Sequence, residues 1–281
     1  MTLDLTLMSA RLKASLENAS VRQSVLHNLF DLFTYVDSHL GLHDAETHAD
    51  FVIGKVRGST NIRETEIEIF TRLQELGIID KIAAKQDERA RTIFGQIRPF
   101  LTRDADILDF GSGSGRVTKL IHANVSRATY GIDVCRYPYE GGGPQLIVYD
   151  GRSIPFPPNS FDIIVSSAVL HHDRENELLL PEFNRVLRVG GRAVIIETIP
   201  MDDSAEELAR TFVIDWFYNR CILLAGVPVP GAYRTQRGWI DLFRRHGFRL
   251  ATIDGIRNPQ HLGIDQQLVP DYHILMVFEK E

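Results

Sequence analysis

The sequence predicts an α/β fold, a doubly wound and mostly parallel sheet with an N-terminal helical region and a lid insertion after the fifth strand. Three observations lead to this prediction. Before residue 100, apolar side chains recur at helical spacing. From residue 106 onward, short apolar runs alternate with helical patterns, which is typical of parallel strands joined by helices. The first of these runs ends in a glycine-rich turn.

With 281 residues, the chain is long enough for one sizeable core and an appendage. We expect a helical region over residues 1–100, which covers the substrate or mediates oligomerisation, and a ligand-binding domain over residues 101–281 that includes the lid at 200–235. The helical region is expected to hold two helices within residues 3–40 and a loop around 41–50. Further helices are expected over residues 62–76, where Gly77 follows the last turn, and over residues 87–101.

In the second half of the chain, the predicted strands alternate with helices or turns. Apolar runs predict strands that start at Ile107 and Phe161, and residues 187–197 read as a helix end, two turn glycines and a fifth strand. The remaining predicted elements are strands over 128–133, 145–149, 249–253 and 272–280 and a helix over 238–246 that ends at Gly247.

The turn after the first strand combines an acid with three glycines. Asp109 is followed by Gly111, Gly113 and Gly115, so a carboxylate and bare backbone amides meet at the C-terminal end of a strand, where nucleotide-like ligands bind. Gly111 permits a backbone conformation closed to other residues, and Gly113 lets a ligand approach the main chain. A dinucleotide fingerprint would place its third glycine at Arg116, so the spacing disfavours NAD.

This motif resembles the first motif of the class I S-adenosylmethionine-dependent methyltransferases, and residues 161–172 and 187–197 are similar to later stretches of the branch called type 11 methyltransferase domains. The resemblance covers residues 100–200 well and implies a Rossmann-like sheet with S-adenosyl-L-methionine as cofactor. Asp133 ends the second strand 22 residues after Gly111, which suits a ribose-binding carboxylate.

The expected cofactor residues lie on the loops that follow the strands. Asp109 would lie near the cationic amino group of the donor, while Asp150 would accept from the adenine amino group and the Gly151 backbone would meet the ring. For any one aspartate, turn or capping chemistry is the alternative. The full cofactor-binding set is Asp109, Gly111, Ser112, Gly113, Gly115, Asp133, Val134, Asp150, Gly151, Arg152 and Ser166.

Three residues are candidates for catalysis. His171 and His172 follow the fourth strand, where a histidine could deprotonate a hydroxyl acceptor, and Glu197 ends the fifth strand and faces the same crevice. The alternatives are a structural or capping role for the histidines and a polar rim for Glu197. We expect no metal, because adjacent side chains on one helix diverge and no third ligand follows at a characteristic spacing.

The insertion at 200–235 begins with Ser204 as an expected helix N-cap and is rich in aromatic residues. We expect it to cover the C-terminal edge of the sheet and to enclose the acceptor together with the N-terminal helices. The alternative is that its rings pack the cover against the sheet. The expected substrate-binding residues are Trp216, Phe217, Tyr218 and Tyr233.

Composition restricts the partners. The formal net charge is -6, and no block of like charges suggests nucleic acid. Cys135 and Cys221 lack metal-ligand spacing, and neither a signal peptide nor a membrane span is expected, so we expect a cytoplasmic protein, for which a homodimer is a possible assembly.

The sequence therefore predicts a methyltransferase for a small organic acceptor, by O- or N-methylation in secondary metabolism. Two alternatives stay open. One is C-methylation of an apolar or quinone-like acceptor. The other is a protein of this fold that binds the cofactor without methyl transfer, as a cyclase or a regulatory module.

Overall fold

The computed structural model describes residues 4–137, 143–200, 202–223, 227–257 and 272–281. The chain forms two compact units. The helical unit contains the described residues of Met1–Gln86 and Pro200–Gly231, and the sheet unit contains those of Asp87–Ile199, Ala232–Arg257 and Tyr272–Glu281. In the described part of the chain, no helix is long and apolar enough to cross a membrane.

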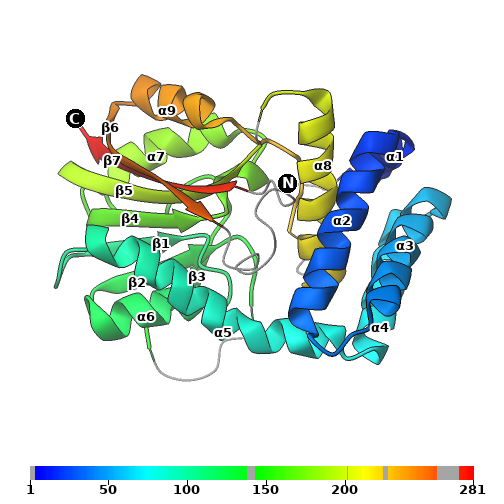
Figure 1. The fold of residues 1–281 in the computed structure, drawn as a ribbon. Helices are drawn as coiled ribbons and strands as arrows, with labels where there is room; N and C mark the ends of the chain where they lie inside the picture. Colours follow the sequence, from blue (N-terminus) through cyan, green and yellow to red (C-terminus); the bar gives the residue numbers. More distant parts are fainter. Residues whose placement is uncertain (1–3, 138–142, 201, 224–226, 258–271) are drawn as a thin grey trace. The chain divides into compact units, whose positions relative to one another are not determined.

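The sheet unit is built on seven strands in the order β3-β2-β1-β4-β5-β7-β6. Strands β1 to β5 pair in parallel, and β7 runs antiparallel to both of its neighbours. This arrangement confirms the predicted fold class (Figure 1). The strands are β1 Ile107–Phe110, β2 Thr129–Asp133, β3 Gln145–Val148, β4 Phe161–Ser167, β5 Leu187–Ile199, β6 Phe248–Arg257 and β7 Tyr272–Lys280.

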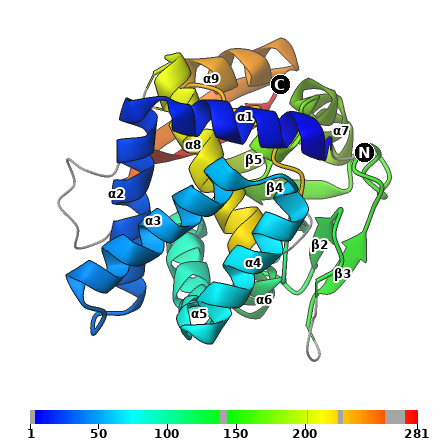
Figure 2. The ribbon, with the colours of Figure 1, turned by 90° about the vertical axis from the view of Figure 1, so that its right-hand side faces the viewer.

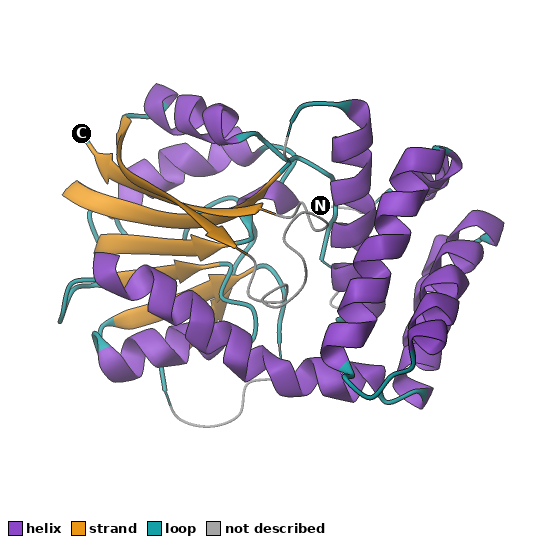
Figure 3. Ribbon diagram, in the orientation of Figure 1, coloured by secondary structure: helices purple, strands orange, loops and turns teal. Residues whose placement is uncertain are grey.

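Helices cover both faces of this sheet (Figure 3). On one face, α7 (Leu179–Val186) and α9 (Gln236–Arg245) pack buried side chains such as Phe183 and Phe243 against the strands. On the other face, α6 (Arg116–Asn124) and the C-terminal half of α5 (Ile78–Ile97) contribute Ile121, Ile93 and Ile97. Both faces are therefore apolar, as parallel strands require. Short 3-10 turns complete the unit at η1 Arg98–Phe100, η2 Leu170–His172 and η3 Asn176–Leu178.

The helical unit is a bundle in which α2 packs against α3 and α8, and α1 packs against α8 (Figure 2). Its core contains fully buried side chains, among them Leu12, Phe33 and Ile69. A π-helical segment, η4 (Phe217–Ile222), continues directly from α8. The helices of this unit are α1 Leu5–Glu17, α2 Ala19–Val36, α3 Leu42–Gly58, α4 Ile62–Glu75, the first part of α5, and α8 Ala205–Trp216.

Two sequence predictions in the helical region were wrong. The expected loop at 41–50 lies in α3, because Ala45, Ala49, Val52 and Val56 line one buried side of a helix. Helix α5 begins at Ile78, nine residues before the expected start at Asp87. By contrast, α4 ends just before Gly77 as predicted, and Gly77 has a left-handed φ of 70°.

The predicted lid at 200–235 contains α8 and η4. The Ser204 side chain accepts from Glu207 N–H, which confirms the predicted N-cap. Residues 201 and 224–226 of the lid lie outside the described residues. The expectation that this segment covers the sheet stays a prediction.

Candidate active site

The candidate site lies at the point in the sheet where the strand order reverses, between β1 and β4. From β1 the chain proceeds through β2 to β3 on one side, and then returns to β4 and β5 on the other. The chain after β1 leads to α6 on one face of the sheet and the chain after β4 to α7 on the other. In open α/β sheets, ligands bind outside the carboxyl ends of the strands at such a point. Asp109, Asp133, Ser166 and Glu197 lie on the four strands nearest this point.

Two glycines of the loop after β1 are needed for different reasons. Gly111 has a φ of +75°, and a Cβ there would lie 2.3 Å from Cγ2 of Val169. The loop after β4 thus occupies the space that a side chain at Gly111 would need. Gly113 also has a positive φ, of +52°, but a Cβ there would meet nothing within 4 Å. Gly113 therefore presents bare backbone to open space, as the close approach of a ligand requires.

Asp133 joins the end of β2 to the glycine loop. Its Oδ2 accepts the Gly113 N–H at 2.8 Å, and its Oδ1 accepts the Cys135 N–H at 2.8 Å. Burial raises the pKa of Asp133, although the backbone N–H donors oppose this shift. Each carboxylate oxygen can accept more than one hydrogen bond, so the side chain can also bind hydroxyl groups.

Asp109 is buried at the end of β1, and the Thr118 hydroxyl donates to its Oδ2 at 2.5 Å. Burial raises the pKa of Asp109 to about 6; the Thr118 hydrogen bond opposes this shift and the charge of Asp133 adds to it. The sequence prediction missed Thr118. Its place one turn before Ile121, on the buried side of α6, was the available signal.

The residues after β3 are more exposed. Asp150 accepts the N–H groups of Arg152 and Ser153 at 2.8 and 2.9 Å, and these bonds lower its pKa. Gly151 has a φ of +79°, and a Cβ there would lie 3.1 Å from Cγ1 of Val134, an exposed apolar side chain. The Arg152 guanidinium lies 3.4 Å from Glu175.

Two serines complete the predicted cofactor set, and Gly115 is the N-cap of α6. The Ser112 N–H donates to the Ile132 carbonyl at 3.0 Å, which fixes the glycine loop against β2. The Ser166 side chain is fully buried, and its Oγ has no hydrogen-bond partner among the described residues. Such a buried polar atom usually marks a place for water or a ligand.

His171 and Glu197 form a buried pair. Nδ1 of His171 lies 2.5 Å from Oε2 of Glu197, while Oε1 of Glu197 accepts the N–H groups of Val169 and Leu170 at 3.0 and 2.7 Å. Because Glu197 accepts hydrogen bonds from the Val169 and Leu170 N–H groups, its ionised form is favoured, and we assign the proton between Oε2 and Nδ1 to Nδ1 of His171. The carboxylate then fixes both the tautomer and the orientation of the ring.

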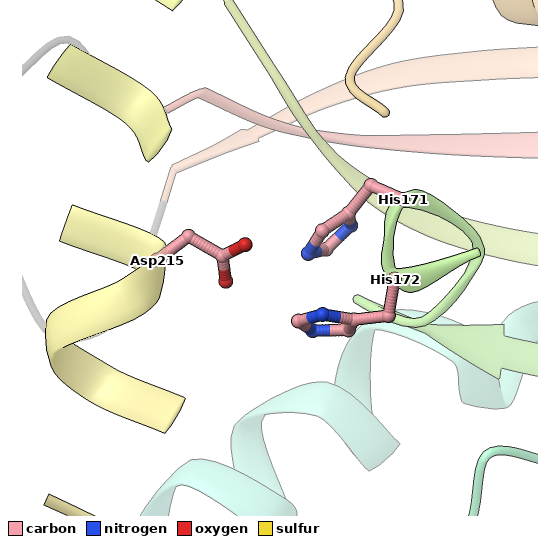
Figure 4. A group of neighbouring side chains, drawn as sticks. All are labelled: His171, His172 and Asp215. Carbon is pink, nitrogen blue, oxygen red and sulfur yellow. The ribbon is translucent and has the colours of Figure 1, made fainter. Parts of the chain in front are cut away.

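The His172 and Tyr233 rings lie beside His171. The centroids of the two histidine rings are 4.2 Å apart, and that of Tyr233 is 5.4 Å from His171. Figure 4 shows the two histidines side by side on η2. The expectation that the adjacent histidines diverge was therefore wrong, because their rings lie in contact on η2. The expectation of no metal stays a prediction.

Trp216 and Phe217 lie in the core of the helical unit. Trp216 is fully buried and its Nε1 donates to Oε1 of Glu66 at 3.1 Å. The Phe217 ring packs edge-on against Phe33, with centroids 6.3 Å apart, and the half-buried Tyr218 lies next to Phe217. The contacts of Trp216 and Phe217 are those of core residues, and their expected role in substrate binding stays a prediction.

Comparisons with known proteins identify the family of this chain. Residues 108–195 match a family model described as a methyltransferase domain. An uncharacterized methyltransferase of Anoxybacillus flavithermus is 34% identical over 175 residues, which span 58% of this chain and 80% of that protein. A ubiquinone/menaquinone biosynthesis C-methyltransferase of Desulfotalea psychrophila is 29% identical over 133 residues, 44% of this chain and half of the relative.

Solved structures show the same fold. A putative methyltransferase of Bacillus halodurans superposes with a TM-score of 0.51 at 13% identity, over 66% of this chain and 98% of that chain. An S-adenosylmethionine-dependent methyltransferase of Mesorhizobium loti gives a TM-score of 0.51 at 19% identity, over 66% and 96%. The chain belongs to the methyltransferases.

The residues at the strand ends fit S-adenosylmethionine, the cofactor that the resemblance of the glycine-rich motif implies. Gly113 leaves open space at its backbone, the buried Asp109 carboxyl suits a cationic amino group, and the Asp133 oxygens suit hydroxyl groups. The exposed Val134 beside Gly151 offers an apolar surface for a planar ring.

Proposed function

We propose that the protein methylates an oxygen or nitrogen atom of a small organic acceptor and that His171 is the general base. The observation that supports this most directly is the short contact between His171 Nδ1 and Glu197 Oε2, at 2.5 Å in a buried setting. A base held through one ring nitrogen by a carboxylate is oriented to use the other.

When bound, S-adenosylmethionine supplies a methyl group on a sulfonium, which is already an excellent leaving group. The protein must therefore hold the acceptor in line with that group and exclude water. The bound cofactor would supply the methyl carbon, to which a lone pair of the acceptor oxygen or nitrogen would bond, and its sulfur would take up the electrons of the broken carbon–sulfur bond. The proton of the acceptor hydroxyl or amine passes to Nε2 of His171, and Glu197 stabilises the imidazolium.

The cofactor roles follow the loops. In this proposal Asp109 faces the amino group, Asp133 the ribose hydroxyls, and Asp150 the adenine amino group. Support comes from the burial of Asp109, the partial burial of Asp133 and the exposure of Asp150. The remaining members line the same loops, at Gly111, Ser112, Gly113, Gly115, Val134, Gly151, Arg152 and Ser166.

The acceptor roles are proposed for fewer residues. Tyr233 lies within ring contact of His171, so it is the aromatic residue we place nearest the reacting atoms. His172 is a second polar group beside His171. Tyr218 is half-buried and suits an apolar ligand contact.

Methylation of carbon is the second candidate. The observation that favours it is the relative from Desulfotalea psychrophila, which is named as a C-methyltransferase and is 29% identical. A base is useful there as well, because a ring hydroxyl that loses its proton makes the neighbouring carbon more nucleophilic.

The test is an acceptor panel of phenols, catechols, amines and quinols, scored by S-adenosylhomocysteine formation and by NMR of the product. We expect a methyl group on oxygen or nitrogen. For His171→Gln we expect about 10²–10⁴-fold slower turnover with unchanged cofactor affinity, and for the control His246→Gln wild-type turnover. A methyl group on carbon would replace the proposal by the second candidate. Wild-type turnover in His171→Gln would remove the base.

A further inference from the structure

The segment that carries Tyr233 is tied to a buried asparagine. Asn176 is the first residue of η3 and is 1% exposed. Its Oδ1 accepts from Nε and Nη2 of Arg234 at 3.2 and 2.8 Å, and its Nδ2 donates to the Ala232 carbonyl at 3.4 Å. Only this orientation of the amide gives every group a partner of the right kind. One side chain therefore binds the residues on both sides of Tyr233.

The anchored tyrosine packs on the proposed base. The Tyr233 and His171 rings have centroids 5.4 Å apart and planes inclined by 32°, within the range of aromatic contacts. Asn176 follows His171 by five residues, whereas Arg234 lies 58 positions from Asn176. The clamp thus joins the turn after β4 to the segment before α9.

The orientation of an imidazole depends on such neighbours. The torsion that turns the ring has broad minima, so the side chain alone does not fix it. Glu197 holds His171 at Nδ1, which is an atom on the rim of the ring. A packed ring beside the imidazole adds a constraint on its plane.

We propose that Asn176 and Arg234 are positioning residues, which hold Tyr233 against His171 and thereby fix the plane of the imidazole for proton transfer. The catalytic part of this statement rests on the proposed function of His171. The structural part, that the clamp protects the His171–Glu197 hydrogen bond, does not.

The test follows the Nδ1–H proton of His171 by NMR, with histidine labelled by ¹⁵N and no acceptor present. The signal is assigned by its loss in His171→Gln. In the wild type we expect slow exchange with water. In Asn176→Ala and in Tyr233→Ala we expect exchange about tenfold faster or more, because the ring opens more often.

Two variants act as controls. Tyr233→Phe keeps the ring and should keep wild-type exchange. Glu177→Ala removes the exposed partner of Arg234, at 3.4 Å, without touching Asn176, and should also keep it. Thermal unfolding is recorded for every variant. If Asn176→Ala does not fold, the comparison of Tyr233→Ala with Tyr233→Phe still tests whether the ring slows exchange of the Nδ1–H proton.

Wild-type exchange in both Asn176→Ala and Tyr233→Ala would overturn the proposal, and so would fast exchange in Tyr233→Phe, since the hydroxyl would then matter instead of the ring. If His171 is not the general base, His171→Gln turns over at the wild-type rate, and this result is independent of the exchange measurement.

Discussion

Two glutamates, one in each unit, are fully buried and differ in what they bind. Glu66 on α4 accepts from Nε and Nη2 of Arg220, each at 2.9 Å, from Trp216 Nε1 at 3.1 Å, and from Nη1 of Arg63 at 2.9 Å. Glu197 on β5 accepts two backbone N–H groups and faces one histidine. Both carboxylates are therefore satisfied, as buried charges must be.

The partners decide what each glutamate can do. A guanidinium stays protonated at any pH of interest, so the Glu66 cluster holds charge in place and moves no proton. An imidazole titrates near neutrality, so the Glu197 pair can accept and release one. Burial and hydrogen-bond number alone do not separate a structural carboxylate from a functional one, whereas the chemistry of its partner does.

The largest expected effect is a loss of turnover when glutamine replaces Glu197, and the same substitution at Glu66 is its control. In Glu197→Gln, the amide oxygen stays with the Val169 and Leu170 N–H groups, so the NH₂ faces Nδ1 of His171. The ring must then carry its proton on Nε2 and cannot accept another. Turnover should fall by about 10²–10⁴, measured as S-adenosylhomocysteine formation.

Glu66→Gln is the matched control for this loss. Its turnover per folded molecule should stay within about threefold of the wild type, because no proton passes through the Glu66 cluster. Equal losses of turnover in the two variants would remove the distinction between the carboxylates.

The second prediction concerns the stability of the helical unit. In Glu66→Ala, Arg220 keeps its buried guanidinium but loses the carboxylate that neutralises it. Removal of one partner of a buried ion pair costs about 3–5 kcal/mol, which urea unfolding would detect.

The double variant Glu66→Met/Arg220→Met should recover much of this stability, since the uncompensated charge is then absent. Unfolding of Glu66→Ala at the wild-type urea concentration would show that the cluster is not required.

The sequence predicted the sheet unit better than the helical unit, for a physical reason. Strands such as β1 and β4 are short apolar runs bounded by turns, so their ends are visible locally, and β7 was predicted over its observed range. The acids at Asp109 and Asp133 could be found because each ends such a run. Helix α3 was missed because the buried positions within 41–50 are only Ala45 and Ala49, two small side chains among polar residues.

Contacts between distant residues could not be predicted. Glu66 meets Arg220 154 positions away, and Asn176 meets Arg234 at a separation of 58. Neither pair leaves a periodic pattern, because each depends on how separate elements pack. The sequence therefore identified the candidates His171 and Glu197, but not the residues that hold Tyr233 beside them.

The third prediction uses Asp109, a buried carboxyl that accepts a hydrogen bond from the Thr118 hydroxyl. Its pKa is about 6 in the folded protein, against 3.8 as the usual value. The native state thus holds the proton more tightly than the unfolded state. The stability that this provides is complete below about pH 4 and is lost as the pH rises through 6, on the order of 3 kcal/mol.

Asp109→Asn removes this titration and still accepts from Thr118. The difference in unfolding free energy between wild type and Asp109→Asn should therefore shift in favour of the variant between pH 4 and pH 7. A difference that does not change with pH would show that Asp109 is hydrated in solution.

The smallest expected effect concerns Asp133. Its partners are backbone N–H groups, so it is paired neither with arginine, as Glu66 is, nor with histidine, as Glu197 is. If its remaining acceptor capacity serves the ribose, Asp133→Ala should weaken binding of S-adenosylhomocysteine by about 1.5–3 kcal/mol, tenfold or more in affinity. Calorimetry measures this directly, with the exposed Asp254→Ala as control. Loss of the Gly113 contact also loosens the glycine loop, so the variant is compared at a temperature well below its unfolding midpoint. Unchanged affinity in Asp133→Ala would show that its carboxylate only stabilises the glycine loop, just as Glu66 stabilises η4. The ribose would then bind another residue at the strand ends.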